Sequence, residues 1–267
     1  MELQLTNKVV LVTGGASGIG KAVVRALAAE GALPVIIDRQ AAAAEMLTDE
    51  LLRQGHTALH VIGDLTAVDR PAQIMDEVVR KLGRIDGLVN NAGINDGVGL
   101  EQGDLERFMH SLQQNLVHYY TMAKYALPWL KQSPQSAIVN IISKTAETGQ
   151  GNTSAYAAAN GGRSALTREW AVELLPYGIR VNGVVVAECD TPAYQNWLQT
   201  LTDPEQKLKE IQQRIPLGNR MTTPEEVAAA VLFLLSPLSS HTTGQLLHVD
   251  GGYVHLDRAL SSLMLKW

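Results

Sequence analysis

The feature that most constrains the fold is a regular alternation of short β-branched runs with amphipathic helical segments. The run "KVVLVT" (residues 8–13) has the continuous apolar character of a strand that is buried on both faces of a parallel sheet. The segment "GKAVVRALAAEG" (20–31) follows it with apolar residues at helical spacing and ends at Gly31, a predicted C-cap. Because such units repeat along the chain, we predict an α/β, Rossmann-type doubly wound parallel sheet with helices on both faces.

The remaining elements continue this alternation to the end of the chain. Further strands are predicted at 33–38, 58–64, 85–93, 136–143, 179–187 and 245–252, and further helices at 41–54, 70–83, 104–131 and 155–177. Another helix should begin at "TPEEV", with Thr223 as N-cap, Pro224 at the first position and Glu226 at the third. No linker or repeat divides residues 1–267, so we predict one domain, in which 188–220 form an irregular substrate loop or lid.

Charge and composition exclude several classes of partner. The net charge is −5 and no basic block is present, which argues against nucleic acid or an anionic membrane as a partner. A single cysteine, Cys189, excludes an internal disulfide, and the histidines show no metal-ligand spacing, so no metal site is predicted. The start "MELQLTNKVV" does not have the pattern of a signal peptide, and the apolar run 227–235 is too short to span a bilayer. We therefore expect a cytoplasmic protein.

A glycine-rich turn after the first predicted strand indicates dinucleotide binding. In "TGGASGIG" (13–20), glycines let the backbone turn tightly and approach a pyrophosphate, which then lies at a helix N-terminus. The second predicted strand ends in Asp38, where a carboxylate would bind the adenosine ribose hydroxyls. That carboxylate would repel a 2′-phosphate, which favours NAD over NADP, although the adjacent Arg39 would weaken the preference.

Together with "NNAG" (90–93), Ser143 and Tyr156, the glycine loop makes the chain resemble the short-chain dehydrogenase/reductase family over nearly its full length. That family combines such a loop with a Ser…Tyr-x-x-x-Lys site, and Asn115 fits its catalytic asparagine. Within the family, the bacterial L-fucose dehydrogenase branch, which oxidises an aldose at the anomeric carbon to a lactone, is the most similar. Its likeness rests on the stretches "NNAGINDGVGL", "SKTAETGQGNTS", "ALTREWAVEL" and "SSHTTGQLLHVDGGYVHLDRAL".

The resemblance also implies the cofactor contacts and the assembly. Asp64 should contact adenine, 90–93 should line the cofactor cleft, and Thr191 should hydrogen-bond the carboxamide. The implied cofactor-binding residues are Gly14, Ser17, Gly18, Ile19, Gly20, Asp38, Arg39, Asp64, Leu65, Asn91, Ala92, Gly93, Tyr156, Asn160 and Thr191. A homotetramer is implied as well, and the tail "GGYVHLDRALSSLMLKW" has enough apolar residues to pack against a neighbouring subunit.

The catalytic residues implied by the resemblance depart from the family at one position. Tyr156 would accept the alcohol proton, Ser143 would hydrogen-bond the reacting oxygen, and Asn115 would hold a relay water. An unperturbed tyrosine, with a pKa of about 10, is a poor base at neutral pH unless a nearby cation favours its phenolate. The family supplies that charge with a lysine, but this chain has Asn160, whose amide can donate to a ribose hydroxyl yet carries no charge.

Three interpretations of Asn160 remain open at this point. The chain is a dehydrogenase impaired by replacement of a native lysine, a natural enzyme that works through Asn160 or with Lys144 or another cation, or a protein that binds the cofactor without catalysis.

Polar and aromatic residues in the predicted loops suit a carbohydrate substrate. After the sixth strand the family often has Pro-Gly, whereas this chain has Val186 and Ala187 there, with Glu188 next. Glu188 either faces a polyhydroxylated sugar or is a surface charge. The predicted substrate-binding residues are Asn95, Ser143, Lys144, Gln150, Asn152, Tyr156, Glu188, Tyr194 and Trp197. The sequence thus predicts an NAD-dependent sugar dehydrogenase. The alternatives are a catalytically silent NAD-binding or regulatory protein and a reductase of another small carbonyl compound.

Overall fold

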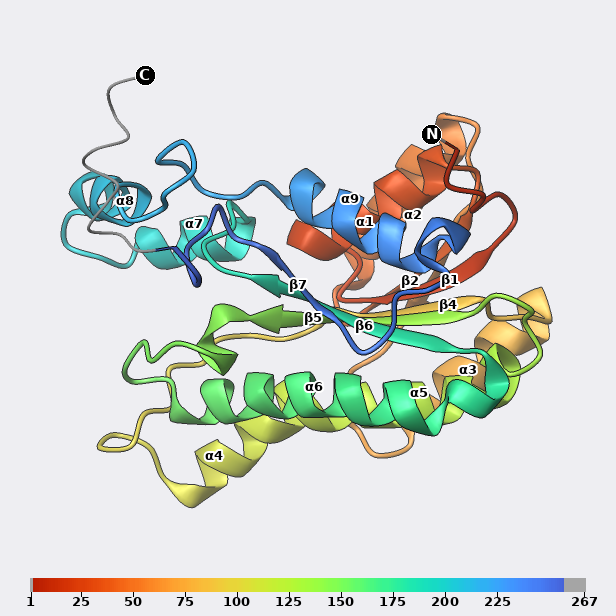
Figure 1. The fold of residues 1–267 in the computed structure, drawn as a ribbon, viewed down its shortest axis with the longest axis horizontal. Helices are drawn as coiled ribbons and strands as arrows, with labels where there is room; N and C mark the ends of the chain where they lie inside the picture. Colours follow the sequence, from red (N-terminus) through yellow and green to blue (C-terminus); the bar gives the residue numbers. More distant parts are fainter. Residues whose placement is uncertain (1, 257–267) are drawn as a thin grey trace.

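A computed structural model describes residues 2–256 of the 267-residue chain. Its centre is a seven-stranded parallel sheet with the strand order β3-β2-β1-β4-β5-β6-β7 (Figure 1). The strands are β1 (Val9–Thr13), β2 (Leu33–Asp38), β3 (Leu59–Ile62), β4 (Gly87–Asn90), β5 (Ala137–Ser143), β6 (Arg180–Val186) and β7 (Leu246–Val249). The predicted packing of the tail against a neighbouring subunit falls largely on residues 257–267, which lie outside the described residues.

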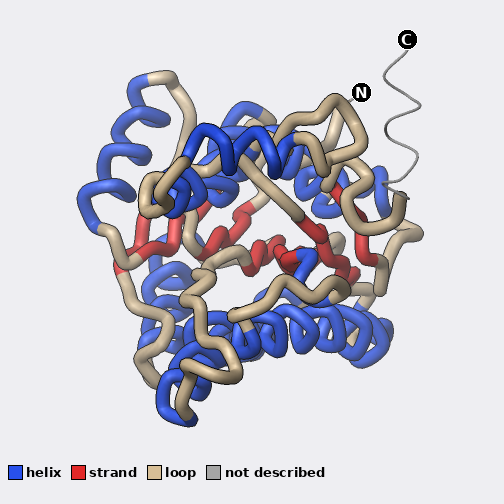
Figure 2. Tube along the Cα trace, turned by 90° about the vertical axis from the view of Figure 1, so that its left-hand side faces the viewer, coloured by secondary structure: helices blue, strands red, loops and turns tan. Residues whose placement is uncertain are grey.

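Helices cover both faces of the sheet, which confirms the predicted fold class (Figure 2). One face is covered by α1 (Gly18–Ala29), α2 (Ala41–Arg53) and α9 (Pro224–Leu235). The other face is covered by α3 (Arg70–Leu82), α5 (His118–Leu130) and α6 (Ser154–Glu173), with α4 (Leu105–Leu112) beside α6. No helix among residues 2–256 is long and apolar enough to cross a membrane.

Strand side chains alternate between the two layers of the core. In β1, Val10 and Val12 belong to the cluster beneath α1, α2 and α9, whereas Val9 and Leu11 belong to the cluster on the other face. Because successive side chains of a strand point to opposite faces, a strand buried on both sides needs an unbroken apolar run. This requirement explains why these strands could be recognised in the sequence without an alternating pattern.

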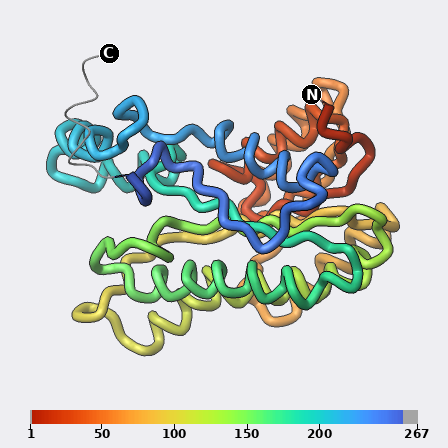
Figure 3. The backbone as a smooth tube through the Cα atoms, in the orientation of Figure 1, coloured from red at the N-terminus to blue at the C-terminus, as the bar shows by residue number. Residues whose placement is uncertain are grey.

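The chain reverses its direction of travel across the sheet at β1, which pairs with β2 on one side and with β4 on the other. In open parallel sheets such a switch point leaves a crevice at the carboxyl ends of the strands, where ligands bind. The loops that follow β1, β4, β5 and β6 all leave the sheet at this end, on the left of the view (Figure 3). The fold therefore places the predicted site residues together.

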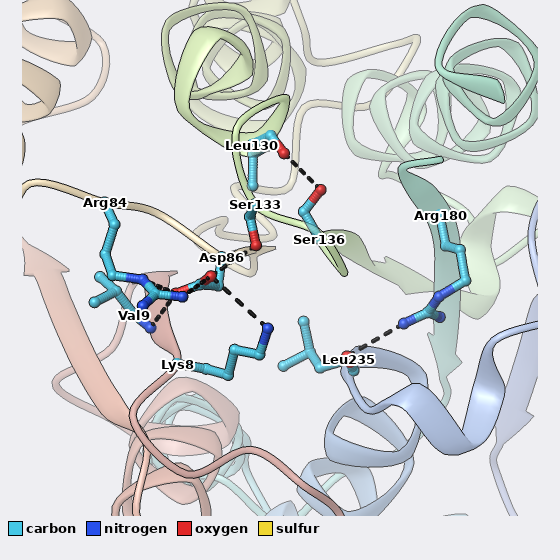
Figure 4. Close-up of polar contacts among 9 residues, drawn as sticks. All are labelled: Lys8, Val9, Arg84, Asp86, Leu130, Ser133, Ser136, Arg180 and Leu235. Atoms are coloured by element: carbon cyan, nitrogen blue, oxygen red, sulfur yellow. Dashed lines mark hydrogen bonds and ion pairs between the residues drawn. The ribbon is translucent and has the colours of Figure 1, made fainter. Parts of the chain in front are cut away.

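At the opposite, amino end of the sheet, Asp86 is a buried anchor just before β4 (Figure 4). Its carboxylate accepts hydrogen bonds from the Val9 backbone N–H (2.9 Å), the Ser133 hydroxyl (2.7 Å) and the Arg84 guanidinium (2.6 and 2.9 Å). Burial by itself raises the pKa of the Asp86 carboxyl, but the hydrogen bonds outweigh it, led by that of Arg84, and the pKa lies below its usual value. This anchor joins the starts of β1 and β4 to the end of α5.

Arg180 is the second polar anchor at the amino end. It begins β6 and donates to the carbonyl oxygens of Leu234, Leu235 and Ser236 and to the Ser239 hydroxyl. These carbonyls belong to the last turn of α9 and the residue after it, where helical hydrogen bonding leaves acceptors unpaired. Arg180 therefore caps α9 from the sheet, and burial lowers its pKa.

Two predicted segments differ from the structure. The helix expected over 104–131 is divided into α4 and α5 by a π-helical turn, Gln113–Val117. The segment 188–220 is not irregular throughout, because it contains α7 (Pro192–Leu198) and α8 (Pro204–Gln212). Each begins with a proline after an N-cap, and these Thr-Pro and Asp-Pro pairs were readable signals in the sequence.

The predicted helix boundaries are otherwise close to those observed. The capping box of α9 is confirmed, since the Thr223 hydroxyl accepts from the Glu226 N–H and the Glu226 carboxylate accepts from the Thr223 N–H. At the end of α1 the C-cap is Glu30 rather than Gly31, and Gly31 follows with a φ of 75°. This is the usual position of a left-handed glycine one residue beyond the cap.

Candidate functional site

The glycine loop between β1 and α1 has the geometry that its sequence predicts. Gly14 and Gly18 have φ angles of 62° and 51°, in the left-handed region that favours glycine. A Cβ at Gly20 would lie 2.1 Å from the carbonyl oxygen of Gly14, so no larger residue fits there. Ser17 stands at the N-cap of α1 but makes no side-chain cap hydrogen bond. The first-turn N–H groups of α1 therefore remain available for an anion.

The segment after β4 is fastened to this loop through Asn91. Its side-chain amide donates to the carbonyl oxygens of Thr13 (2.9 Å) and Gly14 (3.2 Å). The backbone N–H groups of Asn91 and Ala92 both donate to the Thr13 hydroxyl, at 2.9 and 3.0 Å. The predicted cofactor residues of the first and fourth strands thus form one rigid corner of the crevice.

Asp38 closes the other side of the glycine loop. Its two carboxylate oxygens accept from the backbone N–H groups of Ala16 and Gln40, each at 3.0 Å. The residue is 8% exposed, whereas the neighbouring Arg39 is exposed. A carboxylate oriented in this way keeps further acceptor positions for ribose hydroxyls.

Asp64, Leu65, Ile19 and Thr191 complete the surroundings of the loop. Asp64 is exposed and accepts from the backbone N–H and the hydroxyl of Thr66, which hold the pKa of its carboxyl below the usual value. Leu65 and Ile19 are half-buried and pack against the two core clusters. Thr191 caps α7, and its methyl group would be 3.4 Å from a Cβ placed on Gly18. The loop after β6 thus reaches the glycine loop.

Ser143, at the end of β5, and Tyr156, in the first turn of α6, are joined by Asn160. The Asn160 side-chain oxygen accepts from the Ser143 backbone N–H at 2.7 Å, and its side-chain nitrogen donates to the Tyr156 carbonyl at 2.8 Å. Asn160 has no exposed surface. The side-chain nitrogen carries a second N–H group, so donation from Asn160 to a cofactor ribose stays a prediction, and in this structure Asn160 joins the other two residues.

Asn115 lies in the π-helical turn rather than in a regular helix. Its side-chain oxygen accepts from the Ile94 N–H at 2.8 Å, and its side-chain nitrogen donates to the Ser111 carbonyl at 3.0 Å. Its own carbonyl oxygen accepts from Arg163 Nε at 2.6 Å. A relay water on that carbonyl stays a prediction, and such a water would share the oxygen with Arg163. Single π-helical turns within helices are frequent at functional sites.

Arg163 is the site residue that sequence reasoning missed. It is 2% exposed, and its guanidinium lies beneath Asn115, Asn160 and Tyr156. A signal was available, because Tyr156, Asn160 and Arg163 share one face of α6 by helical spacing. The surrounding residues of α6 are mostly alanine and glycine, among which an arginine on the inner face is conspicuous.

The predicted substrate residues fall into two groups. Lys144 and Glu188 form a close, largely buried ion pair, and Lys144 Nζ lies 4.0 Å from the centre of the Tyr253 ring. Burial raises the pKa of Tyr194, and the neighbouring Glu188 charge raises it further. The rings of Tyr194 and Trp197 are 5.2 Å apart, edge to face. With 13% of its side chain exposed, Glu188 is therefore not a free surface charge.

The other predicted substrate residues lie on exposed loops. Asn95, Gln150 and Asn152 are all exposed. Asn152 has a φ of 54°, and its Cα would lie 2.9 Å from a Cβ on Gly99. The loop after β5 therefore rests against the loop after β4, so these residues rim the same end of the sheet.

Three buried titratable groups, those of His118, Tyr119 and Cys189, do not change their protonation near neutral pH. Burial, reinforced by the Arg163 charge, lowers the pKa of His118 to about 3, so its imidazole is neutral. The Tyr119 hydroxyl donates to the Ile141 carbonyl at 3.0 Å, and burial raises its pKa. Cys189 is also buried, which raises its thiol pKa to about 12. The Tyr156 hydroxyl makes no hydrogen bond to another described residue, and its role in proton transfer stays a prediction.

Distant parts of the chain also bring Glu147, His248 and His255 together at the surface. Their ligand atoms lie within 4.8 Å of one another, a grouping that metal-ligand spacing in the sequence did not indicate.

Comparison with known proteins gives consistent relatives. A family model described as enoyl-(acyl carrier protein) reductase matches residues 14–254. The chain is 38% identical to cis-4-hydroxycyclohexanecarboxylate dehydrogenase of Sinomonas cyclohexanicum, covering 92% of this chain and 96% of that protein. It is 35% identical to L-fucose dehydrogenase of Rattus norvegicus, covering 97% and 94% respectively. It is also 35% identical to the 3-oxoacyl-[acyl-carrier-protein] reductase FabG of Thermotoga maritima, covering 94% and 100%.

Solved structures share the whole fold. The Cj0485 dehydrogenase superposes with a TM-score of 0.91 at 44% identity, covering 97% of this chain and 99% of that one. The aldohexose dehydrogenase of Thermoplasma acidophilum superposes with a TM-score of 0.87 at 31% identity, covering 96% and 98%.

Proposed function

The chain belongs to the short-chain dehydrogenase/reductase family, and from this premise we propose that it oxidises an aldose of the L-fucose type to its lactone with NAD. The observation that carries the proposal is the junction of Ser143 and Tyr156 through the Asn160 amide at the carboxyl end of the sheet. This junction holds the backbone of a serine and of a tyrosine through one side chain, and a hydroxyl donor with a phenol is the pair that alcohol oxidation requires.

The residues present fit a dinucleotide. The Gly20 position admits no side chain, and the uncapped start of α1 leaves N–H groups for a pyrophosphate. Asp38 would bind the adenosine ribose hydroxyls and disfavour a 2′-phosphate, whereas the exposed Arg39 is available to a phosphate. When bound, the nicotinamide accepts the hydride from the carbinol carbon. We propose NAD as the preferred cofactor because the Asp38 carboxylate is hydrogen-bonded to the Ala16 N–H of the glycine loop.

The chain's own residues then handle the proton. Ser143, whose oxygen accepts from the Thr145 N–H at 3.2 Å, keeps its hydroxyl proton to donate to the reacting sugar oxygen. The Tyr156 phenolate accepts the proton from the same sugar hydroxyl as the hydride leaves, because it is the group placed for proton transfer beside Ser143. Asn160 keeps the two residues in register by holding the backbone of each.

The predicted substrate-binding residues around Glu188 and Lys144 support a sugar as the substrate. Glu188 and Lys144, largely buried as an ion pair beside Tyr194 and Trp197, offer charged acceptors and donors together with aromatic edges. Sugars present several hydroxyls on a ring with apolar patches. A set of polar and aromatic side chains therefore suits a sugar better than it suits an acyl chain. Two of the similar proteins are named as sugar dehydrogenases, one for L-fucose and one for aldohexoses.

The test is formation of NADH, followed at 340 nm, with L-fucose, other aldoses and a set of simple alcohols. We expect turnover with 6-deoxy or hexose sugars and NAD, and slower turnover with NADP. Tight NAD binding without turnover of any sugar would contradict the proposal and favour a catalytically silent NAD-binding protein. That alternative has one observation in its favour, namely the neutral Asn160 beside Tyr156.

A second enzymatic function is reduction of a small carbonyl compound. It is supported by the likeness to FabG of Thermotoga maritima and by the enoyl-reductase description of the matching family model. The same chain assayed with NADH or NADPH and a panel of ketones separates this function from sugar oxidation, since the preferred direction and cofactor differ.

We also propose a homotetramer in the cytoplasm, as the resemblance implies. Size-exclusion chromatography with light scattering tests the assembly, and a monomeric mass would contradict it.

A further inference from the structure

The first inference concerns the positive charge that Tyr156 needs, and it rests on the proposed function. A phenol accepts a proton at neutral pH only if a cation close by favours its ionised form. Asn160, the residue that joins Tyr156 to Ser143, is an uncharged amide. The charge must therefore come from another residue.

The structure offers two buried cations near this junction, Lys144 and Arg163. Lys144 follows Ser143 in the chain, but its ammonium is paired with the Glu188 carboxylate and lies over the Tyr253 ring. The pair is close to neutral as a unit, so its field at Tyr156 is that of a dipole rather than a full charge.

Arg163 is not neutralised in this way. Its guanidinium donates to the carbonyl oxygens of Asn115 (2.6 Å) and Ile141 (3.2 Å) and to the side-chain oxygens of Asn160 (3.1 Å) and Asn115 (3.4 Å). All of these acceptors are uncharged, and no carboxylate among residues 2–256 forms an ion pair with it. Its Cζ lies 6.0 Å from the centre of the Tyr156 ring.

We propose that Arg163 supplies the positive charge that favours the ionised form of Tyr156 in this protein. It is a positioning residue, because it acts on Tyr156 through space and through the Asn160 side chain that it hydrogen-bonds. The charge that the family places at position 160 is thus supplied from the next turn of the same helix.

Among residues 2–256 no carboxylate forms an ion pair with Arg163, and the exposed Asp64 carboxylate acts on the neighbouring His118. From α5, His118 is neutral, and Tyr119 lies with its ring 4.2 Å from the Arg163 Cζ and keeps its proton. The π-helical turn and β5 contribute the carbonyls of Asn115 and Ile141. A Cβ at Gly93 would lie 2.7 Å from the guanidinium, so the loop after β4 leaves no room for a side chain there.

The first experiment is the pH dependence of sugar oxidation in the wild type, R163A and R163K. R163A removes a positive charge that lies 6.0 Å from the centre of the Tyr156 ring, so it should raise the midpoint of the rate. R163K keeps the charge and should stay within about half a unit, although it loses hydrogen bonds. An equal rise in R163A and R163K would overturn the proposal, because only the hydrogen bonds are lost in both.

Chemical rescue separates charge from packing. Guanidinium and urea have nearly the same shape, but only guanidinium is charged. Guanidinium at tens of millimolar should return the R163A midpoint toward the wild-type value, and urea should not. R168A, which removes an exposed arginine of the same helix, is the matched control and should leave the profile unchanged. Equal rescue by urea would contradict the role of the charge.

A readout without turnover distinguishes failure of this inference from failure of the proposed function. The difference absorbance of tyrosinate near 295 nm, taken as wild type minus Y156F, follows ionisation of Tyr156 whatever the substrate is. We expect this signal at lower pH in the wild type and R163K than in R163A. If R163A does not fold, the comparison of wild type with R163K still decides, because loss of the low-pH signal in R163K would contradict the proposal.

The second inference rests on a different part of the surface. His248, on β7, donates from Nε2 to a carboxylate oxygen of Glu147 at 3.0 Å. His255, in the turn after β7, packs edge to face on His248 with the ring centres 4.3 Å apart. Their ligand atoms lie within 4.8 Å of one another, and each residue is at least partly exposed.

We infer that Glu147, His248 and His255 form a surface site for a divalent transition metal such as Zn²⁺. Two imidazoles and a carboxylate are a ligand set that zinc takes in proteins, with a fourth position left for water. The metal would connect the segment that follows Ser143 to the turn after β7. It therefore lies outside the Ser143–Tyr156 junction and takes no part in the proposed reaction.

The test is titration of ZnCl₂ into metal-free, tag-free protein by calorimetry at pH 7.5. We expect one equivalent to bind in the micromolar range and to raise the melting temperature, because a ligand that binds only the folded state stabilises it. H248A and H255A should each weaken binding at least tenfold, whereas H56A, remote from the cluster, should not. Absence of binding, or binding unchanged in H248A and H255A, would overturn the inference.

Discussion

The two ends of the sheet use buried arginines in opposite ways. At the amino end, Arg180 donates to the carbonyls that end α9 and thereby completes a helix. At the carboxyl end, Arg163 also donates to carbonyls, but its Cζ lies 6.0 Å from the centre of the Tyr156 ring and it donates to the Asn160 side chain. Both guanidinium groups donate to carbonyl oxygens. The two arginines differ in the groups that lie near their positive charge.

This difference teaches where a buried charge is structural and where it is functional. Arg180 and Asp86 contact groups that hold strands and helices together, such as the Ser239 and Ser133 hydroxyls. Their removal should therefore lower stability and leave catalysis intact. Arg163 faces a phenol with no hydrogen-bond partner among the described residues. Removing the Tyr156 hydroxyl should therefore change catalysis more than stability.

The largest expected effect comes from Tyr156. Replacing it with phenylalanine removes the proton acceptor, and we expect kcat for sugar oxidation to fall by about 10²–10⁴-fold, with little change in NAD binding. The matched control is Y177F, at the other end of α6, where Tyr177 is exposed and lies under the Lys131 ammonium. Steady-state kinetics of both variants is the measurement. If Y177F lost as much activity as Y156F, the assignment of catalysis to the carboxyl end of the sheet would be contradicted.

Arg180 should give the largest effect on stability. In R180M the carbonyls at the end of α9 lose their donors, which we expect to lower the free energy of unfolding by about 3 kcal/mol. R168M, in which an exposed arginine is removed, should change it by less than about 0.5 kcal/mol. Urea unfolding measures both free energies. If R180M were still folded under assay conditions and had lost activity, the division between the two ends would be contradicted.

The frame of the molecule was predictable because its signals are local. Strands buried on both faces need continuous apolar runs, and Asp38 ends such a run at the position where β2 leaves the sheet. The capping box at Thr223 was equally readable, since each of its bonds joins residues one turn apart. The segment 188–220, predicted to be irregular, contains two helices, and their Thr-Pro and Asp-Pro starts are local signals as well.

The site was predictable only in part, because its decisive contacts join residues far apart in the chain. Helical spacing places Tyr156 and Asn160 on one face, but it does not say that Asn160 binds the Ser143 N–H. Nor does any local pattern place Arg163 beneath Asn115, which lies on another element. The grouping of Glu147 with His248 depends likewise on the pairing of β6 with both β5 and β7.

Asp86 offers a pH-dependent test at the amino end. Its folded-state pKa lies below the usual value, so its contribution to stability is present above about pH 4 and is lost as the pH falls through the folded-state pKa. D86N should lower the free energy of unfolding by about 2 kcal/mol at pH 7, and the difference from wild type should shrink below pH 4. D76N, at an exposed position, is the control. A difference that stayed constant from pH 7 to pH 3 would contradict the assignment.

The smallest expected effect sharpens the comparison, because it concerns a structural residue at the functional end. Thr223 caps α9 close to the loop after β6, and T223A removes one hydrogen bond to the Glu226 N–H. We expect a loss of about 1 kcal/mol in unfolding free energy and kcat within about twofold of wild type. T223S keeps the hydroxyl and should retain most of the stability. If T223A instead reduced kcat tenfold at unchanged stability, then position at the carboxyl end, rather than contact with Tyr156 and Ser143, would govern function.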